Sequence, residues 1–257
     1  MNVKKLSPKL YRFLARLRMG LTSETIHIGT AGARYHINRH SYVERLIATG
    51  EFEKARAAFL CERLGPDDIF IDIGANIGFF SVLAVRLGAQ VQAFEPEPNN
   101  FYRLQRNIKL NGFNPDQIAV FNCALGNTSG EVCLNRPLSD NYGRATIGFM
   151  EAADAVKVPL QRLDTMLKPN KTRYVVKIDV EGAELQVLEG ADSLMDKMKT
   201  GSLWLVEVHT GCGVKASAVA EKFLHHGYGV SYFDDAIGRI VPDAPKGQDV
   251  MVVAERR

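Results

Sequence analysis

The most constraining feature of this chain is a short apolar run that leads into two glycines four residues apart. Residues 68–81 read DIFIDIGANIGFFS, in which the apolar run ends at Gly74 and a second one begins after Gly78. Such a run is typical of a parallel strand buried on both faces, and residues 79–87 are expected to begin a helix. Glycines at the turn let the backbone bend and approach a ligand beside the unpaired N–H groups of that helix. The segment therefore predicts a turn that binds a nucleotide-like cofactor.

An acidic residue closes the next predicted strand. Glu95 follows the run QVQAF, 21 positions after Gly74. A carboxylate at a strand end can accept hydrogen bonds from both hydroxyls of a ribose. A dinucleotide fold would favour Gly-x-Gly-x-x-Gly, whereas this chain has Asp72-x-Gly-x-x-x-Gly. Asp72 and Glu95 have an alternative role as a helix N-cap or surface-loop acid, but their spacing favours an adenosine-containing cofactor.

These segments resemble class I S-adenosylmethionine-dependent methyltransferases. Two further segments, KIDVEGAE at 177–184 and VEVH at 206–209, are similar to those of FkbM-type methyltransferases, and FEP at 94–96 and ALG at 124–126 stand in the expected order between them. The resemblance spans about residue 51 to the C-terminus. It implies methyl transfer from S-adenosylmethionine, most often to a hydroxyl of a sugar, a glycan or a secondary metabolite. The cofactor-binding residues that it implies are Asp72, Gly74, Ala75, Asn76, Gly78, Glu95, Pro96, Asn122, Ala124 and Asp179. Asn122 or a nearby backbone group is expected to meet the adenine.

The composition is that of one ordinary globular core. The chain has 257 residues, of which 46% are hydrophobic and 24% charged. The net charge is +3 and, outside the N-terminus, the basic residues are scattered, so nothing indicates a nucleic acid partner. The four cysteines lack metal-ligand spacing and no secretory signal precedes them, which predicts reduced thiols in a cytoplasmic enzyme. No run approaches the roughly 20 apolar residues of a membrane span.

Residues 1–64 are predicted to form an N-terminal extension, and residues 65–257 the methyltransferase domain. The first twenty residues predict a basic amphipathic helix that packs on the domain or a partner subunit, with weak contact to an anionic membrane surface as the alternative. A hairpin over 25–37 and a helix over 51–64 follow. Beyond residue 65 strand-like and helical patterns alternate, which predicts an α/β fold with a doubly wound, mostly parallel, seven-stranded sheet.

Residues 126–159 depart from this alternation. Short strands are expected at 130–135 and 144–147, linked by a polar loop over 137–143. In open α/β sheets ligands bind beyond the carboxyl ends of the strands, so an excursion after the third strand could border the acceptor pocket. Its candidate contacts are Ser139, Asp140, Asn141 and Tyr142. A loop of this composition could equally be only solvated.

Two strand ends carry the predicted chemistry. Side chains alternate along a strand, so Lys177 and Asp179 share one face of residues 174–179, and Glu207 and His209 share one face of residues 205–209. If the two strands are neighbours in register, Lys177 meets Glu207 inside the sheet as a structural ion pair. Asp179 then meets His209 at the mouth of the sheet.

Methyl transfer to a hydroxyl needs an aligned acceptor and a base that takes its proton. We predict Asp179 as the residue nearest the methyl group, and His209 as the proton acceptor or the group that orients the acceptor, with Glu181 as the alternative base. Asp179, Glu181 and His209 could also bind a divalent cation, but three ligands so arranged are a weak pattern and no metal is predicted. Glu184 is expected to begin a helix outside the site.

Two other functions stay open at this stage. One is a methyltransferase for RNA or protein, and the other is a non-catalytic scaffold that binds adenosine. The Asn/Asp-Pro-Pro-Tyr/Phe element typical of base amino-group methylation is absent from the sequence. A scaffold has no need of Gly74, Gly78, Glu95 and Asp179 together, and a dehydrogenase is disfavoured because the third glycine of its motif is missing. The identity of the acceptor and the oligomeric state are not encoded in these patterns.

Overall fold

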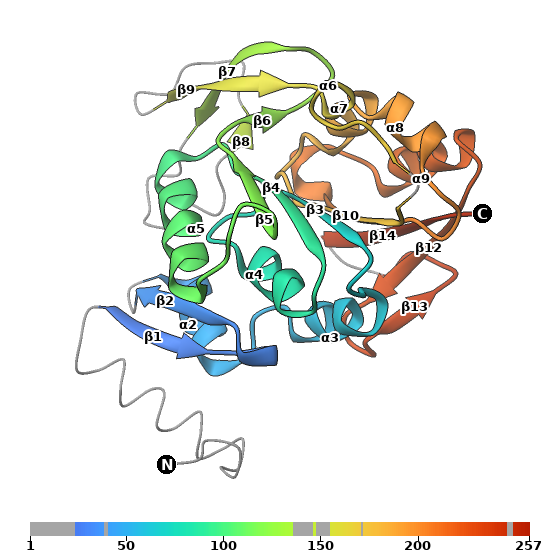
Figure 1. The fold of residues 1–257 in the computed structure, drawn as a ribbon. Coiled ribbons are helices and arrows are strands. Elements are labelled where there is room, and N and C mark those ends of the chain that lie inside the picture. Colours follow the sequence, from blue (N-terminus) through green and yellow to red (C-terminus); the bar gives the residue numbers. More distant parts are fainter. Residues whose placement is uncertain (1–23, 39–40, 136–145, 148–154, 171, 246–248) are drawn as a thin grey trace.

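The computed structural model describes residues 24–38, 41–135, 146–147, 155–170, 172–245 and 249–257. Its centre is an eight-stranded sheet with strand order β13-β12-β14-β11-β10-β3-β4-β5 (Figure 1). The five strands from β5 to β11 run parallel, whereas β14 is antiparallel to both of its neighbours. The bounds are β3 Ile69–Ile73, β4 Gln90–Phe94, β5 Ile118–Phe121, β10 Tyr174–Ile178, β11 Leu203–His209, β12 Tyr228–Asp234, β13 Arg239–Val241 and β14 Asp249–Arg256. The doubly wound, mostly parallel sheet is confirmed, and β13 adds an eighth strand through its pairing with β12.

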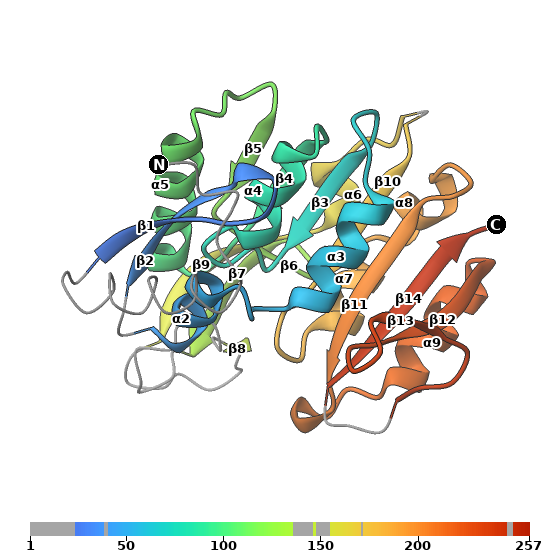
Figure 2. The same cartoon turned by 90° about the horizontal axis from the view of Figure 1, so that it is seen from below.

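Helices cover both faces of this sheet because its strands are apolar on both sides (Figure 2). Ile69, Ile71 and Ile73 of β3 pack into one cluster with the helices that follow β9, whereas Phe70 packs into the other with the helices that precede β5. The first group is α6 Leu163–Met166, α7 Glu184–Glu189, α8 Asp192–Lys197 and α9 Ala216–His225, and the second is α3 Lys54–Arg63, α4 Phe79–Arg86 and α5 Pro98–Asn111. Lys177 and Glu207 lie on the α3–α4 face, where they contact Phe80 and Arg56.

The N-terminal hairpin is joined to this core through α5. Strands β1 Glu24–Ile28 and β2 Arg34–Asn38 pair antiparallel, and α2 Tyr42–Thr49 packs beside them. The backbone N–H groups of Arg34 and His36 donate to the side chains of Asn111 and Asn107 at 3.0 and 2.8 Å. The predicted hairpin is therefore confirmed. The side-chain amides of Asn107 and Asn111, one helical turn apart on α5, accept hydrogen bonds from backbone N–H groups along the outer edge of β2. The predicted helix over the first twenty residues lies outside the described residues.

A second, four-stranded sheet with order β6-β9-β7-β8 lies next to the carboxyl edge of the main one (Figure 1). Its strands are β6 Ala124–Leu125, β7 Gly130–Asn135, β8 Thr146–Ile147 and β9 Val156–Gln161. The expected strand at 130–135 is confirmed, while β9 was not expected from the sequence. The candidate substrate loop with Ser139, Asp140, Asn141 and Tyr142 lies outside the described residues.

The segment after Ala183, where a helix was expected to begin at Glu184, folds as two short helices, α7 and α8. The break falls at Gly190, where an added Cβ would lie 2.0 Å from the carbonyl oxygen of Gly126, so only glycine fits.

Among the described helices, none combines the length and the apolar character needed to cross a lipid bilayer.

Candidate active site

The turn after β3 is held against the ends of two neighbouring strands. The N–H groups of Gly74 and Ala75 both donate to the carbonyl of Phe94 at 3.0 Å. Gly74 has a φ of +79°, and a Cβ at this position would lie 1.9 Å from the carbonyl oxygen of Asp179. The next polar residue, Asn76, also takes a left-handed conformation with a φ of +53°. The sequence thus needs glycine at position 74 for conformation and for close approach to the end of β10.

The carboxylate of Glu95 is anchored beside this turn. Its two oxygens accept from the backbone N–H of Asn76 at 2.7 Å and of Glu97 at 2.9 Å. Burial raises the pKa of Glu95 to about 7, although these two hydrogen bonds oppose the shift. The side chain of Asn100 is a third donor to this carboxylate. Because a carboxylate offers about four acceptor positions, it can still accept a hydrogen bond from a ribose hydroxyl.

A cavity opens beyond the carboxyl ends of β3, β4 and β10. Its empty volume is about 630 Å³, including space open to solvent. Seven of the predicted site residues line it, namely Gly74, Asn76, Glu95, Pro96, Ala124, Asp179 and Glu181. Its wall also contains apolar side chains suited to an aromatic base, including Phe94, Cys123 and Leu134. We call it the adenosine cavity, after the group that the resemblance predicts to bind there.

Four other residues implied by the resemblance do not line this cavity. Asp72 is buried on the α4 side and accepts from the hydroxyl of Ser81 at 2.6 Å. A Cβ at Gly78 would meet Leu104 at 2.4 Å, so this glycine allows α4 and α5 to pack closely. Ala75 faces a smaller cavity on the α4 side of the turn. Asn122 donates to the carbonyls of Glu95 and Pro96 at 2.8 and 3.1 Å, so it supports the turn that carries Glu95.

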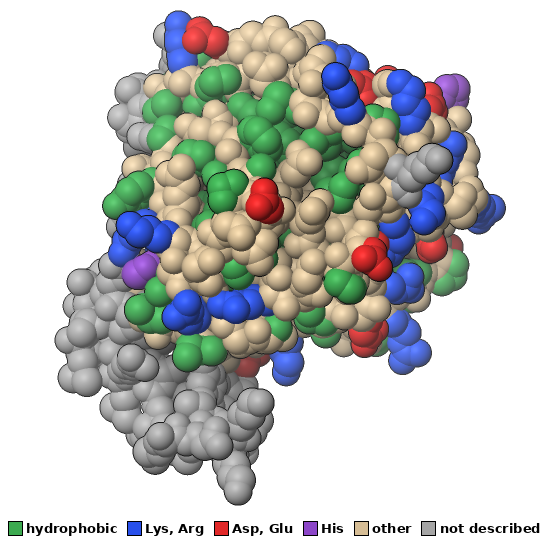
Figure 3. All heavy atoms as spheres, viewed as in Figure 1, with side chains coloured by type: hydrophobic (Ala, Val, Ile, Leu, Met, Phe, Trp, Pro, Cys, Tyr) green, Lys and Arg blue, Asp and Glu red, His purple; other side chains and the backbone are tan. Residues whose placement is uncertain are grey.

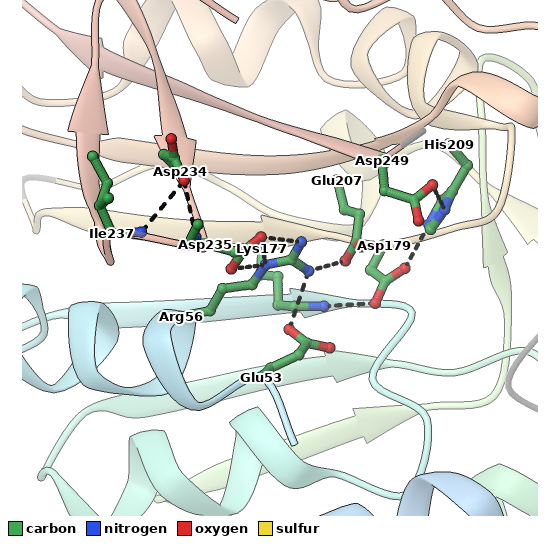
Figure 4. A network of polar contacts seen from close by, with 11 residues as sticks. Glu53, Arg56, Lys177, Asp179, Glu207, His209, Asp234, Asp235, Ile237 and Asp249 are labelled. Atoms are coloured by element: carbon green, nitrogen blue, oxygen red, sulfur yellow. Dashed lines mark hydrogen bonds and ion pairs between the residues drawn. The ribbon is translucent and has the colours of Figure 1, made fainter. Parts of the chain in front are cut away.

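Asp179 lies at the centre of a chain of charges (Figure 4). One carboxylate oxygen accepts from the ammonium of Lys177 at 2.9 Å, and the other lies 3.1 Å from Nε2 of His209. Nδ1 of His209 lies 3.2 Å from Asp249 and 3.7 Å from Glu181. The predicted contact between Asp179 and His209 is confirmed.

The predicted pair of Lys177 and Glu207 is wrong, because the strands are offset by two residues. Lys177 pairs with Leu205 across the sheet, and not with Glu207. The ammonium of Lys177 binds Asp179, and the Glu207 carboxylate accepts from Arg56 of α3 at 2.5 Å. Arg56 also binds Asp235 at 2.9 Å. Arg56 was not predicted as a site residue, because the segment before β3 was expected to form an extension and no motif marks this residue.

His209 is held in its protonated form. Burial alone would lower its pKa, but the hydrogen bond and charge of Asp179, with Glu181 and Glu207, raise the pKa to about 10. Both ring nitrogens face carboxylates, and only the imidazolium can donate from both. A protonated histidine orients its neighbours well, but it has no lone pair with which to take a proton.

This protonation makes the stability of the fold depend on pH. Because the pKa is raised from 6.5 to about 10, the stabilisation is fully present below pH 6.5 and is lost as the pH rises through about 10. We expect the free energy of unfolding of the wild type, relative to His209→Gln, to fall by about 2 to 4 kcal/mol across this window. Urea unfolding at pH 6 and pH 10 measures the difference, and an equal gap at both values would contradict the assignment.

Asp179, Glu181 and His209 offer ligand atoms within 4.8 Å of one another, as the cation alternative requires. In the described structure, however, Asp179 and His209 already neutralise each other, and Lys177 adds a further positive charge. A divalent cation would have to displace the imidazolium proton and compete with this ammonium.

The order of these elements matches a known family. Residues 72–230 match the family model described as the methyltransferase FkbM domain. The chain belongs to this family. The FkbM domain so defined contains the glycine turn, Glu95, Asp179 and His209, but it begins after Glu53 and Arg56.

The chain is also similar to known methyltransferases. The chain is 33% identical to "Methyltransferase 1" of Beauveria bassiana over 49% of its own length and 60% of that protein. It is 31% identical to "Hexuronic acid methyltransferase AglP" of Haloferax volcanii over 61% of its own length and 62% of that protein. The matches thus span about three fifths of these relatives. An FkbM methyltransferase structure from Methylobacillus flagellatus shares the fold, with a TM-score of 0.51 at 16% identity over 80% of this chain and 54% of that one.

Proposed function

We propose that this protein is an S-adenosylmethionine-dependent O-methyltransferase that acts on a hydroxyl of a sugar, a glycan or a secondary metabolite. The observation that carries the proposal is the adenosine cavity, which joins the glycine turn and Glu95 at one end to Asp179 and Glu181 at the other. Family membership and relatives named as methyltransferases support it. S-adenosylmethionine would supply a methyl group activated on a sulfonium.

The chain's own residues have separable roles in this proposal. Glu95 would bind the ribose hydroxyls, and Phe94 and Ala124 would enclose the base. Asp179, ionised because Lys177 and His209 lower its pKa against the effect of burial, would lie at the reacting end of the cavity. Glu181 is the better proton acceptor, since His209 already carries a proton. His209 would keep Asp179 and Glu181 oriented toward the acceptor.

The alternatives named from the sequence gain no specific support. On the face drawn in Figure 3, Lys and Arg side chains are interspersed with acidic ones around the rim, rather than gathered into one basic patch. RNA binding draws on such a patch for much of its affinity. A scaffold would not need the buried charges of Lys177 and Glu207, which are costly to bury. A hydroxyl acceptor remains the proposal.

Calorimetry with S-adenosylhomocysteine tests cofactor binding. The wild type is expected to bind it, and Glu95→Gln should bind at least tenfold more weakly, a loss of about 1.4 kcal/mol for a charge-assisted contact. Because ribose hydroxyls donate to the ionised form of Glu95, affinity should also fall as the pH drops below about 7. Glu131→Gln, which removes an exposed acid from β7, is the matched control. A wild type that binds NADH and not S-adenosylhomocysteine would overturn the proposal.

A further inference from the structure

An open groove runs between α3 and the turn at residues 235–238, which joins β12 to β13. Its empty volume is about 1220 Å³, including space open to solvent. Phe59 of α3 packs against Phe233 of β12 with the ring centres 5.1 Å apart, and this contact holds the two walls together. The charged residues that line the groove are Glu51, Glu53, Lys54, Arg56, Glu207 and Asp235. We call it the α3 groove.

The inner end of the α3 groove lies beside the reacting end of the adenosine cavity. Glu53 and Glu207 line the groove, and a carboxylate oxygen of each lies within 4.8 Å of the other and of an oxygen of Asp179 (Figure 4). Asp179 in turn lines the adenosine cavity. A hydroxyl bound between Glu53 and Glu207 would therefore lie beside the carboxylate that is proposed to face the methyl group.

The α3 groove carries more negative than positive charge. Four of its charged lining residues are acidic and two are basic. Arg56 binds three of these acids, namely Glu53, Glu207 and Asp235, so one guanidinium offsets three carboxylates and holds them in place. Hydroxyl and ammonium groups can donate to the carboxylate oxygens, whereas a carboxylate ligand would be repelled by them.

Apolar surface lies next to these carboxylates. Ile237 is 52% exposed and lines the α3 groove, together with the exposed side chains of Ala58 and Ala236. A sugar ring carries hydroxyls around its edge and C–H groups on its faces. Its hydroxyls can donate to the fixed carboxylates while one face packs on the aliphatic side chains. The lining therefore suits a sugar better than a purely apolar ligand.

We propose that the α3 groove binds the methyl acceptor, and that it selects a sugar that is neutral or carries an amino group over one that carries a carboxylate. The proposal rests on the proposed function and names the acceptor site and its charge class. Of the six charged lining residues, only Glu207 lies within the matched family domain at residues 72–230. Segments that flank this domain would thus determine the choice of acceptor, while the domain itself binds the cofactor.

Three methyl glycosides of different charge test this selection. Methyl glucoside is neutral, methyl glucosaminide has an amine in place of one hydroxyl, and methyl glucuronide has a carboxylate in place of one hydroxymethyl group. For transfer of a tritiated methyl group from S-adenosylmethionine, kcat/KM should be at least about tenfold higher for the first two than for the glucuronide. Glu51→Lys reverses one exposed charge of the groove and should reduce this preference at least about threefold. Glu62→Lys, at an exposed position of α3 outside the groove, should keep the preference.

A bulky side chain in the groove tests where the acceptor binds. Ala58 is exposed on α3 and lines the groove, so Ala58→Trp fills part of the groove without disturbing the core. The KM for methyl glucoside should rise at least about tenfold, while the Kd of S-adenosylhomocysteine stays within about twofold because the adenosine cavity is unchanged. Glu62→Trp, one helical turn farther along α3 and outside the groove, should leave both constants within about twofold of the wild type.

The outcomes separate this proposal from the function on which it rests. A wild type that methylates the glucuronide as fast as the glucoside would overturn the charge class and leave the methyltransferase proposal standing. So would a wild type that binds S-adenosylhomocysteine but methylates none of the three glycosides. An unchanged KM in a folded Ala58→Trp would remove the α3 groove as the acceptor site, and the wild-type preference decides if that variant does not fold. A wild type that does not bind S-adenosylhomocysteine would instead overturn the proposed function.

Discussion

Replacing Asp179 with asparagine is expected to lower the rate of methyl transfer at least a hundredfold. The substitution keeps the shape of the side chain but removes the charge that lies between Lys177 and His209. The imidazolium of His209 then loses its main counter-ion, so the pKa of His209 falls. The charged groups at the acceptor side of the cavity are then no longer held in place. A positioned acid or base is typically worth about 10² to 10⁴ in rate. The measurement is turnover with a hydroxyl acceptor at saturating cofactor, alongside the Kd of S-adenosylhomocysteine.

Asp249→Asn is the matched control for this prediction. Asp249 contacts the other nitrogen of His209 at 3.2 Å, but its side chain is 51% exposed and it does not line the adenosine cavity. Its loss should change turnover less than fivefold. If Asp179→Asn and Asp249→Asn had equal effects, the role of Asp179 would be only to hold His209. A folded Asp179→Asn variant with wild-type turnover would remove Asp179 from the chemistry.

The residues whose location the sequence predicted correctly lie at the carboxyl ends of strands. Gly74, Glu95, Asp179 and His209 each close a strand of a parallel sheet, and such strand ends lie along one edge. Local patterns suffice there, because the apolar run identifies the strand and its last polar residue identifies the edge. Seven of the predicted residues line the adenosine cavity. The contact between Asp179 and His209 was also predicted, although from a strand register that was wrong.

The parts that the sequence did not predict depend on distances across the fold. The alternation of side chains along a strand shows which face of the sheet a residue occupies, but it does not show the register between two strands. Lys177 was therefore predicted to pair with Glu207, whereas it binds Asp179. The partner of Glu207 comes from α3, more than a hundred residues earlier, and Arg56 belongs to no motif. Gly78 and Asn122 were predicted to bind cofactor, but neither lines the adenosine cavity in the described structure. Gly78 allows α4 and α5 to pack closely, and Asn122 supports the turn that carries Glu95. A glycine or an asparagine in a motif can support backbone packing or hydrogen bonding as readily as it can contact a ligand.

Arg56 offers the sharpest test of how this ionic network stabilises the fold. Its guanidinium contacts Glu207 at 2.5 Å and Asp235 at 2.9 Å, and Glu207 is only 8% exposed. Arg56→Met leaves the buried carboxylate of Glu207 without its counter-ion, so we expect the free energy of unfolding to fall by about 3 to 5 kcal/mol. Arg56→Met combined with Glu207→Met should cost much less than the sum of the two single changes, because two apolar side chains then pack in place of two charges. Urea unfolding of all four proteins gives the coupling energy.

Two comparisons decide which partner Glu207 has. Asp235→Asn removes the half-exposed contact of Arg56 and should cost no more than about 1 kcal/mol, as exposed ion pairs usually do. A second cycle with Lys177→Met and Glu207→Met tests the pairing that the sequence suggested. Its coupling energy should be less than half that of the Arg56 cycle, since Lys177 binds Asp179 and acts on Glu207 only through space. Additive losses for Arg56 and Glu207, or a stronger coupling of Glu207 to Lys177, would show that α3 does not hold this carboxylate.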